Sequence, residues 1–129
     1  MAITFRQLIQ SLKDYDNQYA SAMPVAPGAE ASCWGIQYIW FKDGVLHLGQ
    51  HDDEGYDIGL IVREIEKCLP EVVLDEIAVV KIGAVGWGAS KGKIFDKYGE
   101  DAEEFSVKSS EVKRKGEDFC KWILKFEEI

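Results

Sequence analysis

The sequence predicts an α+β domain in which a mainly antiparallel sheet is built on a central hairpin at about residues 36–50. Three observations lead to this fold class. Two apolar runs flank the dipeptide Asp43-Gly44, amphipathic helical patterns precede and follow them, and a β-branched run occupies Ile77–Val85. N-terminal, middle and C-terminal helices are expected to pack on the sheet. A chain of 129 residues is expected to form one domain, spanning residues 1–129.

An amphipathic helix is predicted over residues 4–20. Apolar side chains recur there at three- and four-residue steps: Phe5, Leu8, Ile9, Leu12, Tyr15 and Tyr19. Thr4 can cap this helix, and Gln7 three residues later can complete a capping box. The next stretch, Met23–Ser32, contains two prolines and a glycine and is predicted to be a loop.

The hairpin is predicted from its turn. Asp43-Gly44 suits a two-residue type I′ turn, which needs positive φ at both positions. This turn places Trp40 opposite His47 in the ladder. Because the run Ile36–Phe41 is apolar on both of its faces, the hairpin is expected at the centre of the sheet, covered on both sides.

A second helix is predicted over Ile58–Leu69. Asp57 can cap its start, and Pro70 ends it. Further along the chain, Lys93–Lys97 and Glu104–Val107 are weaker strand candidates that could form an edge hairpin across an acidic turn.

The C-terminal segment fits two structures. Alternate positions are apolar as in a strand (Cys120, Trp122, Leu124, Phe126), but apolar residues also follow helical spacing (Val112, Phe119, Trp122, Ile123, Phe126). We predict a helix over Ser110–Phe126, because Ser109 or Ser110 can cap it and because Glu-to-Lys pairs occur at i,i+4 spacing. Gly116 opposes this choice by about 1 kcal/mol, so the strand stays as the alternative.

The charge balance narrows the class of partner. The chain has 23 Asp and Glu against 15 Lys and Arg, a formal net charge of −8. Direct binding to nucleic acid or to an anionic membrane is not expected, because such binding rests on neutralising phosphate with basic side chains. A basic protein partner, or mimicry of nucleic acid, fits this charge, and a purely solubilising role is the plain alternative.

Hydropathy and cysteine usage predict a cytoplasmic protein. No run approaches the roughly 20 apolar residues of a membrane span, and the N-terminus is too polar for a signal peptide. The three cysteines, Cys33, Cys68 and Cys120, are widely spaced and odd in number. A disulfide framework is therefore not expected, and a reducing compartment fits.

A glycine-rich loop, Gly83–Lys93, follows the predicted strand Ile77–Val85. It matches neither the phosphate-binding loop, which needs Gly-Lys-Ser/Thr, nor the spacing of the dinucleotide fingerprint. A tight glycine turn is the simpler interpretation. The alternative function for this chain is a small-ligand-binding protein or enzyme that uses this loop, with Gly86, Trp87, Gly88, Lys91 and Lys93 as ligand-binding residues.

No catalytic set and no metal site are predicted, and no cofactor is expected. His47 and His51 are close to acidic residues, but strand residues four apart are about 13 Å apart, too far for one ion. The serines lack a G-x-S-x-G setting. The protein is therefore predicted to be a binding protein rather than an enzyme.

Carboxylates cluster at three places: Asp52-Asp53-Glu54, Glu100-Asp101 with Glu103-Glu104, and Glu127-Glu128. A charge run is usually a solvated surface, but clusters in turns can project together and direct docking on a basic partner. Our hypothesis is a small acidic interaction module, an inhibitor or immunity-type protein, whose partner-binding residues are Asp52, Asp53, Glu54, Trp87, Glu100 and Asp101. An oligomeric structural subunit is a third possibility.

Overall fold

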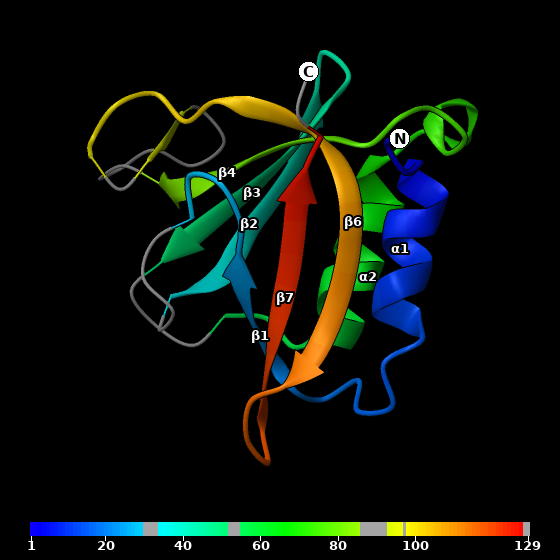
Figure 1. Cartoon of the computed structure of the whole chain (residues 1–129), viewed down its shortest axis with the longest axis vertical. Coiled ribbons are helices and arrows are strands. Elements are labelled where there is room, and N and C mark those ends of the chain that lie inside the picture. Colours follow the sequence, from blue (N-terminus) through cyan, green and yellow to red (C-terminus); the bar gives the residue numbers. More distant parts are fainter. Residues whose placement is uncertain (30–33, 52–54, 86–92, 97, 128–129) are drawn as a thin grey trace.

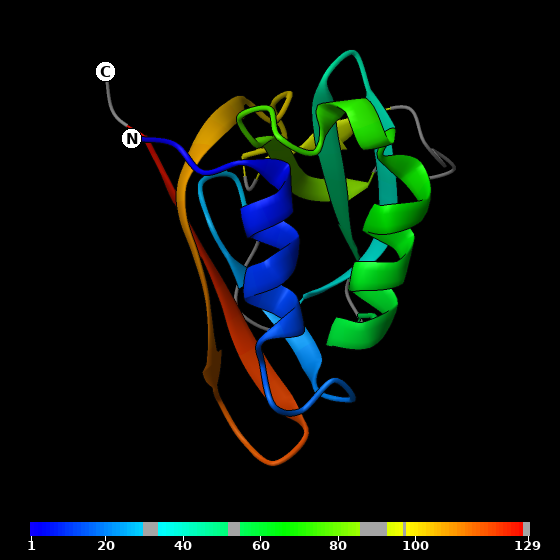
Figure 2. The same ribbon diagram turned by 90° about the vertical axis from the view of Figure 1, so that its right-hand side faces the viewer.

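The computed structural model describes residues 1–29, 34–51, 55–85, 93–96 and 98–127. In this part of the chain, two α-helices pack on one curved, seven-stranded sheet (Figures 1 and 2). The elements are α1 (Phe5–Lys13), β1 (Ser21–Val25), β2 (Gly35–Lys42), β3 (Val45–His51), α2 (Ile58–Cys68), a short 3-10 helix (Glu71–Val73), β4 (Val79–Val85), β5 (Ile94–Phe95), β6 (Glu104–Arg114) and β7 (Phe119–Phe126).

The sheet is mixed, which corrects the predicted fold class. Its order is β1-β7-β6-β4-β3-β2, with β5 also paired to β4. The β1–β7 and β3–β4 pairs are parallel, whereas β2–β3, β4–β6 and β6–β7 are antiparallel. The hairpin at residues 36–50 is therefore not central: β2 is at one end of the sheet order, and β4 and β6 occupy the middle.

The predicted C-terminal helix is wrong. Residues 110–126 form most of the β6–β7 hairpin, with pairs running from Val107↔Phe126 to Arg114↔Cys120. Cys120, Trp122 and Leu124 are buried on one face of β7, as the alternative strand pattern required. Burial of these side chains outweighs the few tenths of a kcal/mol that surface Glu-Lys pairs add to a helix.

Both remaining helices begin where the sequence predicts. Thr4 accepts a hydrogen bond from the Gln7 backbone N–H, and the Gln7 side chain accepts from the Thr4 N–H, so the capping box is confirmed. Asp57 caps α2 in the same way by accepting from Leu60 N–H at 2.8 Å. Helix α1, however, ends at Lys13 instead of residue 20.

The predicted loop at Met23–Ser32 is also partly wrong. Ser21–Val25 is strand β1, which pairs in parallel with β7. Pro24 is compatible with this strand because β1 is at an end of the sheet order. Proline lacks a backbone N–H and is tolerated in such edge strands, which form a ladder along one side.

The predicted β2–β3 turn and register are confirmed. Asp43 and Gly44 have φ of 53° and 81°, and Trp40 is paired with His47. Both faces of the hairpin are covered. One face joins the main core beneath the helices, and on the other face Trp40 is 7% exposed in a small cluster with Ile94 and Ala102.

The expected edge hairpin between Lys93–Lys97 and Glu104–Val107 does not form as such. β5 and β6 pair separately with β4, at Ala84–Val85 and at Val79–Lys81 respectively. The chain between them folds back on itself, because Ala102 N–H donates to the Ile94 carbonyl at 2.9 Å. This arrangement leaves Ile82 between the two paired stretches of β4.

Candidate interaction cleft

A cleft opens where strand β6 changes its partner. The first residues of β6 pair with β4, through Val79↔Ser106, and the later residues pair with β7, from Val107↔Phe126 onward. A cavity of about 680 Å³ lies at this changeover. Its lining comes from β6, from the end of β7, from the turn after β5 and from the loop after β1: Pro27, Gly28, Asp96, Glu103, Glu104, Phe105, Ser106, Phe126 and Glu127.

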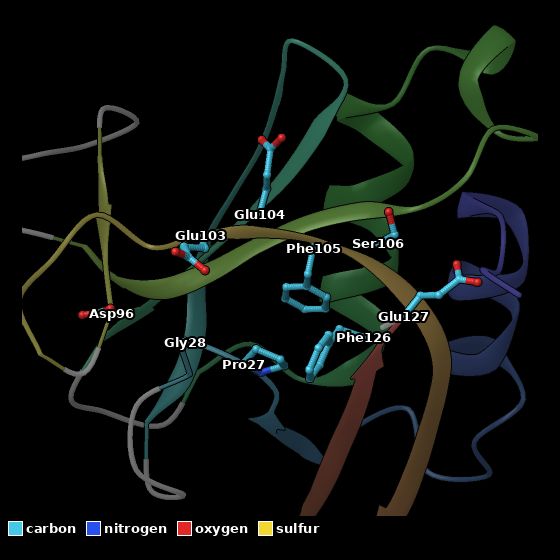
Figure 3. A pocket seen from close by; sticks show the side chains of 9 residues that line it. All are labelled: Pro27, Gly28, Asp96, Glu103, Glu104, Phe105, Ser106, Phe126 and Glu127. Atoms are coloured by element: carbon cyan, nitrogen blue, oxygen red, sulfur yellow. The ribbon is translucent and has the colours of Figure 1, made fainter. Parts of the chain in front are cut away.

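The floor of this cleft is apolar. Figure 3 shows the rings of Phe105 and Phe126 next to each other, with Pro27 beside Phe126. Phe126 is 43% exposed and belongs to the few large apolar side chains on the surface of the described residues. An accessible aromatic floor of this kind can pack against an apolar group or the aliphatic stem of a charged side chain.

Gly28 lets the loop after β1 close the side of the cleft. It has φ of +83°, and a Cβ atom at this position would lie 2.7 Å from the Ile82 carbonyl oxygen. The loop thus fits against β4 in the gap between β5 and β6. Glycine is required there both by the positive φ and by the close approach of the two backbones.

Four acidic residues line the cleft, and one of them, Glu104, points away from its apolar floor. Figure 3 shows Asp96 and Glu103 toward the Gly28 side, Glu127 on the opposite side, and Glu104 directed away from the phenylalanine rings at the rim. Asp96 accepts hydrogen bonds from the backbone N–H groups of Tyr98 (2.8 Å) and Glu100 (3.0 Å). Its carboxylate is therefore held in place by the turn that it stabilises.

Neutralisation of these carboxylates is incomplete. Glu127 forms an ion pair with the amino group of Met1 at 2.9 Å. Lys81 is paired with Glu104 in the β4–β6 ladder. Among the described residues, however, Asp96, Glu103 and Glu104 form no ion pair within 4.0 Å. The cleft therefore keeps a negative potential that favours a cationic group.

The carboxylates do not form a metal site. In the part of the chain that the structure describes, no three His, Cys, Asp or Glu side chains gather closely enough to hold a metal ion. His47 instead stacks on Trp40, with ring centroids 4.9 Å apart. Burial lowers the pKa of His47, and the neighbouring Lys81 and Lys42 add to this effect.

Of the predicted partner-binding residues, Asp52, Asp53, Glu54 and Trp87 lie outside the described residues. Glu100 and Asp101 belong to the turn that contributes Asp96 and Glu103 to the cleft, but they do not line it. The prediction thus placed acidic residues near the cleft without identifying its lining.

The alternative ligand-binding residues Gly86, Gly88 and Lys91 also lie outside the described residues. Lys93 is described, and its ammonium pairs with Asp101 at 3.4 Å and lies 5.6 Å from the centroid of the Phe95 ring. Two residues that the sequence assigned to competing functions are therefore partners of each other. Lys93 gives no support to phosphate binding by the glycine-rich loop.

The sequence did not single out Phe105, Phe126 or Pro27. Glu103, Glu104 and Glu127 were recognised as parts of acidic clusters, but their gathering around one cavity depends on pairing between β6 and β7. The available signal was the alternation of apolar residues up to Phe126, which also fits a strand that ends beside an acidic pair.

Comparison with protein-family models, with curated protein sequences and with solved structures found no match to this chain. Neither helix in the described residues is long and apolar enough to cross a membrane.

Proposed function

We propose that this protein is an acidic interaction module that binds a basic protein partner through the cleft between β6, β7 and the loop after β1. The observation that carries the proposal is the position of Glu103 beside the Phe105–Phe126 floor, with Glu104 at the rim of the cleft. Neither carboxylate has an ion-pair partner among the described residues. An apolar floor bordered by carboxylates is complementary to the side chain of arginine or lysine.

Physical chemistry favours arginine in this setting. Its guanidinium group can form paired hydrogen bonds with a carboxylate and can stack on an aromatic ring, whereas its stem can lie along apolar surface. Lysine would make the same charge contact with less directional bonding. The net charge of −8 adds long-range attraction to any basic surface and opposes binding to nucleic acid.

Inhibition of the partner is part of the proposal. A basic protein that acts on an anionic substrate, such as a nuclease, needs its positive surface free, and a module that covers this surface would block it. We place the protein in a reducing cytoplasm, because its three cysteines are widely spaced in the sequence and odd in number.

The test is retention of basic proteins by the immobilised chain from a lysate, at about 50 mM and about 500 mM salt. The Glu103→Gln, Glu104→Gln double variant should retain about tenfold less of the basic species than the wild type at low salt. The matched control is Glu76→Gln with Glu117→Gln, which removes the same charge from exposed positions that do not line the cleft.

High salt should weaken retention by the wild type and by the control variant, because exposed charges are screened. Equal retention by the cleft variant and the control variant would contradict the proposal. Retention that is insensitive to salt would contradict it as well.

A further inference from the structure

A second cavity of about 660 Å³ adjoins the acidic cleft. The two cavities share Pro27, Phe126 and Glu127 in their linings, so they meet around Phe126. The second cavity is lined by apolar side chains of β1 and β7, including Val25 and Ile123. We call the combined feature the bipolar groove, because acidic residues line one of its ends and lysines line the other.

The two ends of the bipolar groove have opposite charge. Asp96, Glu103 and Glu104 line one end, whereas Lys108 and Lys125 line the other, together with the ion pair between the Met1 amino group and Glu127. Neither lysine makes an ion pair within 4.0 Å among the described residues. The basic end therefore has free cationic groups in a chain whose overall charge is −8.

Exposed apolar surface connects the two ends. Val25 is 41% exposed and Phe126 is 43% exposed, and both line the groove. A partner that covers these side chains gains about 25 cal/mol of binding free energy, before other costs, for each Å² of apolar area buried. The middle of the groove thus offers a hydrophobic contact, flanked by a negative end and a positive end.

The two charged ends are separated by about the length of a short extended segment. Glu104 and Lys108 both belong to β6 and are four residues apart, which is at most about 13 Å along the strand because the register of β6 shifts between Val107 and Ser109. In an extended peptide, side chains at i, i+2 and i+4 point to the same side. Three such side chains can reach the acidic end, the apolar middle and the basic end.

We infer that the groove binds an extended segment of its partner that carries a basic, an apolar and an acidic side chain at alternate positions. The basic side chain binds beside Asp96, Glu103 and Glu104, the apolar side chain packs on Phe126, and the acidic side chain pairs with Lys108 and Lys125. This inference rests on the proposed function and adds to it that the docking segment is not uniformly basic.

Charge complementarity decides between this occupant and a purely basic one. A uniformly basic segment would satisfy the acidic end but would place a cation beside Lys108 and Lys125, where like charges repel. A segment with opposite charges at its two ends meets an opposite charge at each position.

The experiment titrates the isotope-labelled chain with two peptides of equal length at low salt. One has the core Arg-Ser-Phe-Ser-Glu, and the other has Arg-Ser-Phe-Ser-Arg, each with Gly-Ser flanks. The inference predicts that the first binds about fivefold or more tightly than the second, although simple attraction to an acidic chain favours the second. Amide shifts should localise to residues of β6 and β7 that border the groove.

A charge reversal on the protein sharpens this test. The Lys108→Glu, Lys125→Glu variant should invert the preference, so that the doubly basic peptide binds more tightly. The control is Lys113→Glu with Lys121→Glu. These exposed lysines are opposite each other in the β6–β7 ladder and do not line the groove. The control variant should keep the wild-type preference.

The outcomes separate the inference from the proposed function. Tighter binding of the doubly basic peptide to the wild type, with shifts in the groove, would overturn the inference and leave the proposed function standing. Binding of neither peptide in the groove would overturn both. A doubled solution mass that reverts to the monomer in the Lys108→Glu, Lys125→Glu variant would show that a second copy fills the groove, which also overturns the inference.

Discussion

The two hairpins of this sheet differ in how many of their faces are buried. The β2–β3 hairpin turns in two residues at Asp43-Gly44 and buries apolar side chains on both of its faces. The β6–β7 hairpin buries one face, with Trp122 at its centre, and leaves lysines and carboxylates on the other side and at its end. One hairpin is scaffold throughout, whereas the other combines a scaffold face with accessible surface.

This difference underlies the proposed position of the binding surface. A hairpin that is covered on both faces offers little side-chain surface for recognition. β6 and β7 anchor the core through one face, and the site at which β6 leaves β4 for β7 opens the cleft. The candidate interaction surface therefore depends on a strand whose other residues hold the fold together.

The largest expected effect is on stability, from Trp122→Ala. Trp122 is fully buried, and its indole N–H donates to the Ser110 hydroxyl at 2.8 Å. Its removal should lower the free energy of unfolding by about 3–5 kcal/mol in a urea titration. Trp40→Ala, in the smaller cluster on the outer face, should cost about 2 kcal/mol. Equal losses would show that the two hairpins contribute equally to the core.

A matched pair of glycine substitutions compares the hairpins next. A Cβ atom at Gly49 of β3 would lie 2.4 Å from Val85 Cγ2 and 3.0 Å from Tyr38 Cβ, so Gly49→Ala should destabilise by about 1–3 kcal/mol. Gly116, in the β6–β7 turn, has no atom within 4 Å of that position. Gly116→Ala should be neutral or stabilising by up to about 1 kcal/mol. A loss at Gly116 as large as that at Gly49 would contradict this account.

The β6–β7 hairpin should be sensitive to alkali through Cys120. Burial raises the pKa of this thiol from 9.0 to about 11. Between these values the unfolded chain releases the thiol proton and the folded chain retains it, so stability falls by at most about 1.4 kcal/mol per pH unit. Urea titrations at about pH 8.5 and about pH 10.5 should show a smaller fall for Cys120→Ala than for the wild type. An identical fall would exclude this contribution.

The β2–β3 hairpin should respond to acid instead, with the smallest effect. Burial lowers the pKa of His47 below 6.5 in the fold. As the pH falls below 6.5, the unfolded chain takes up a proton before the folded chain does, so stability decreases. His47→Gln should remove this part of the pH dependence in thermal unfolding between about pH 7 and about pH 5. A wild-type profile that rises toward acid would contradict the direction.

The sequence predicted local features well. The caps at Thr4 and Asp57 and the turn at Asp43-Gly44 each depend on residues a few positions apart, and the structure has all of them. The position of the hairpin in the sheet could not be predicted in this way. It follows from parallel pairing between β3 and β4, which are separated in the chain by helix α2.

The C-terminal segment explains why the sequence identified only part of the candidate site. The predicted helix depended on the pairs Glu111–Lys115 and Glu117–Lys121, each of which adds about 0.2–0.5 kcal/mol to the stability of a helix. In the structure Lys113 approaches Glu111 at 3.8 Å across two residues of a strand, and Gly116 lies in the turn. A helix here cannot bring Phe126 and Glu127 beside Glu103 and Phe105, so the acidic clusters could be listed from the sequence but not assembled.

The most direct measurement maps the binding surface by NMR, using the isotope-labelled chain and the basic protein recovered by the wild type. We expect the amide shifts to concentrate at residues 103–109 and 123–127, and we expect the Glu103→Gln, Glu104→Gln variant to lose them. Shifts concentrated on the β2–β3 hairpin, with residues 103–109 and 123–127 unchanged, would rule out the cleft as the binding surface.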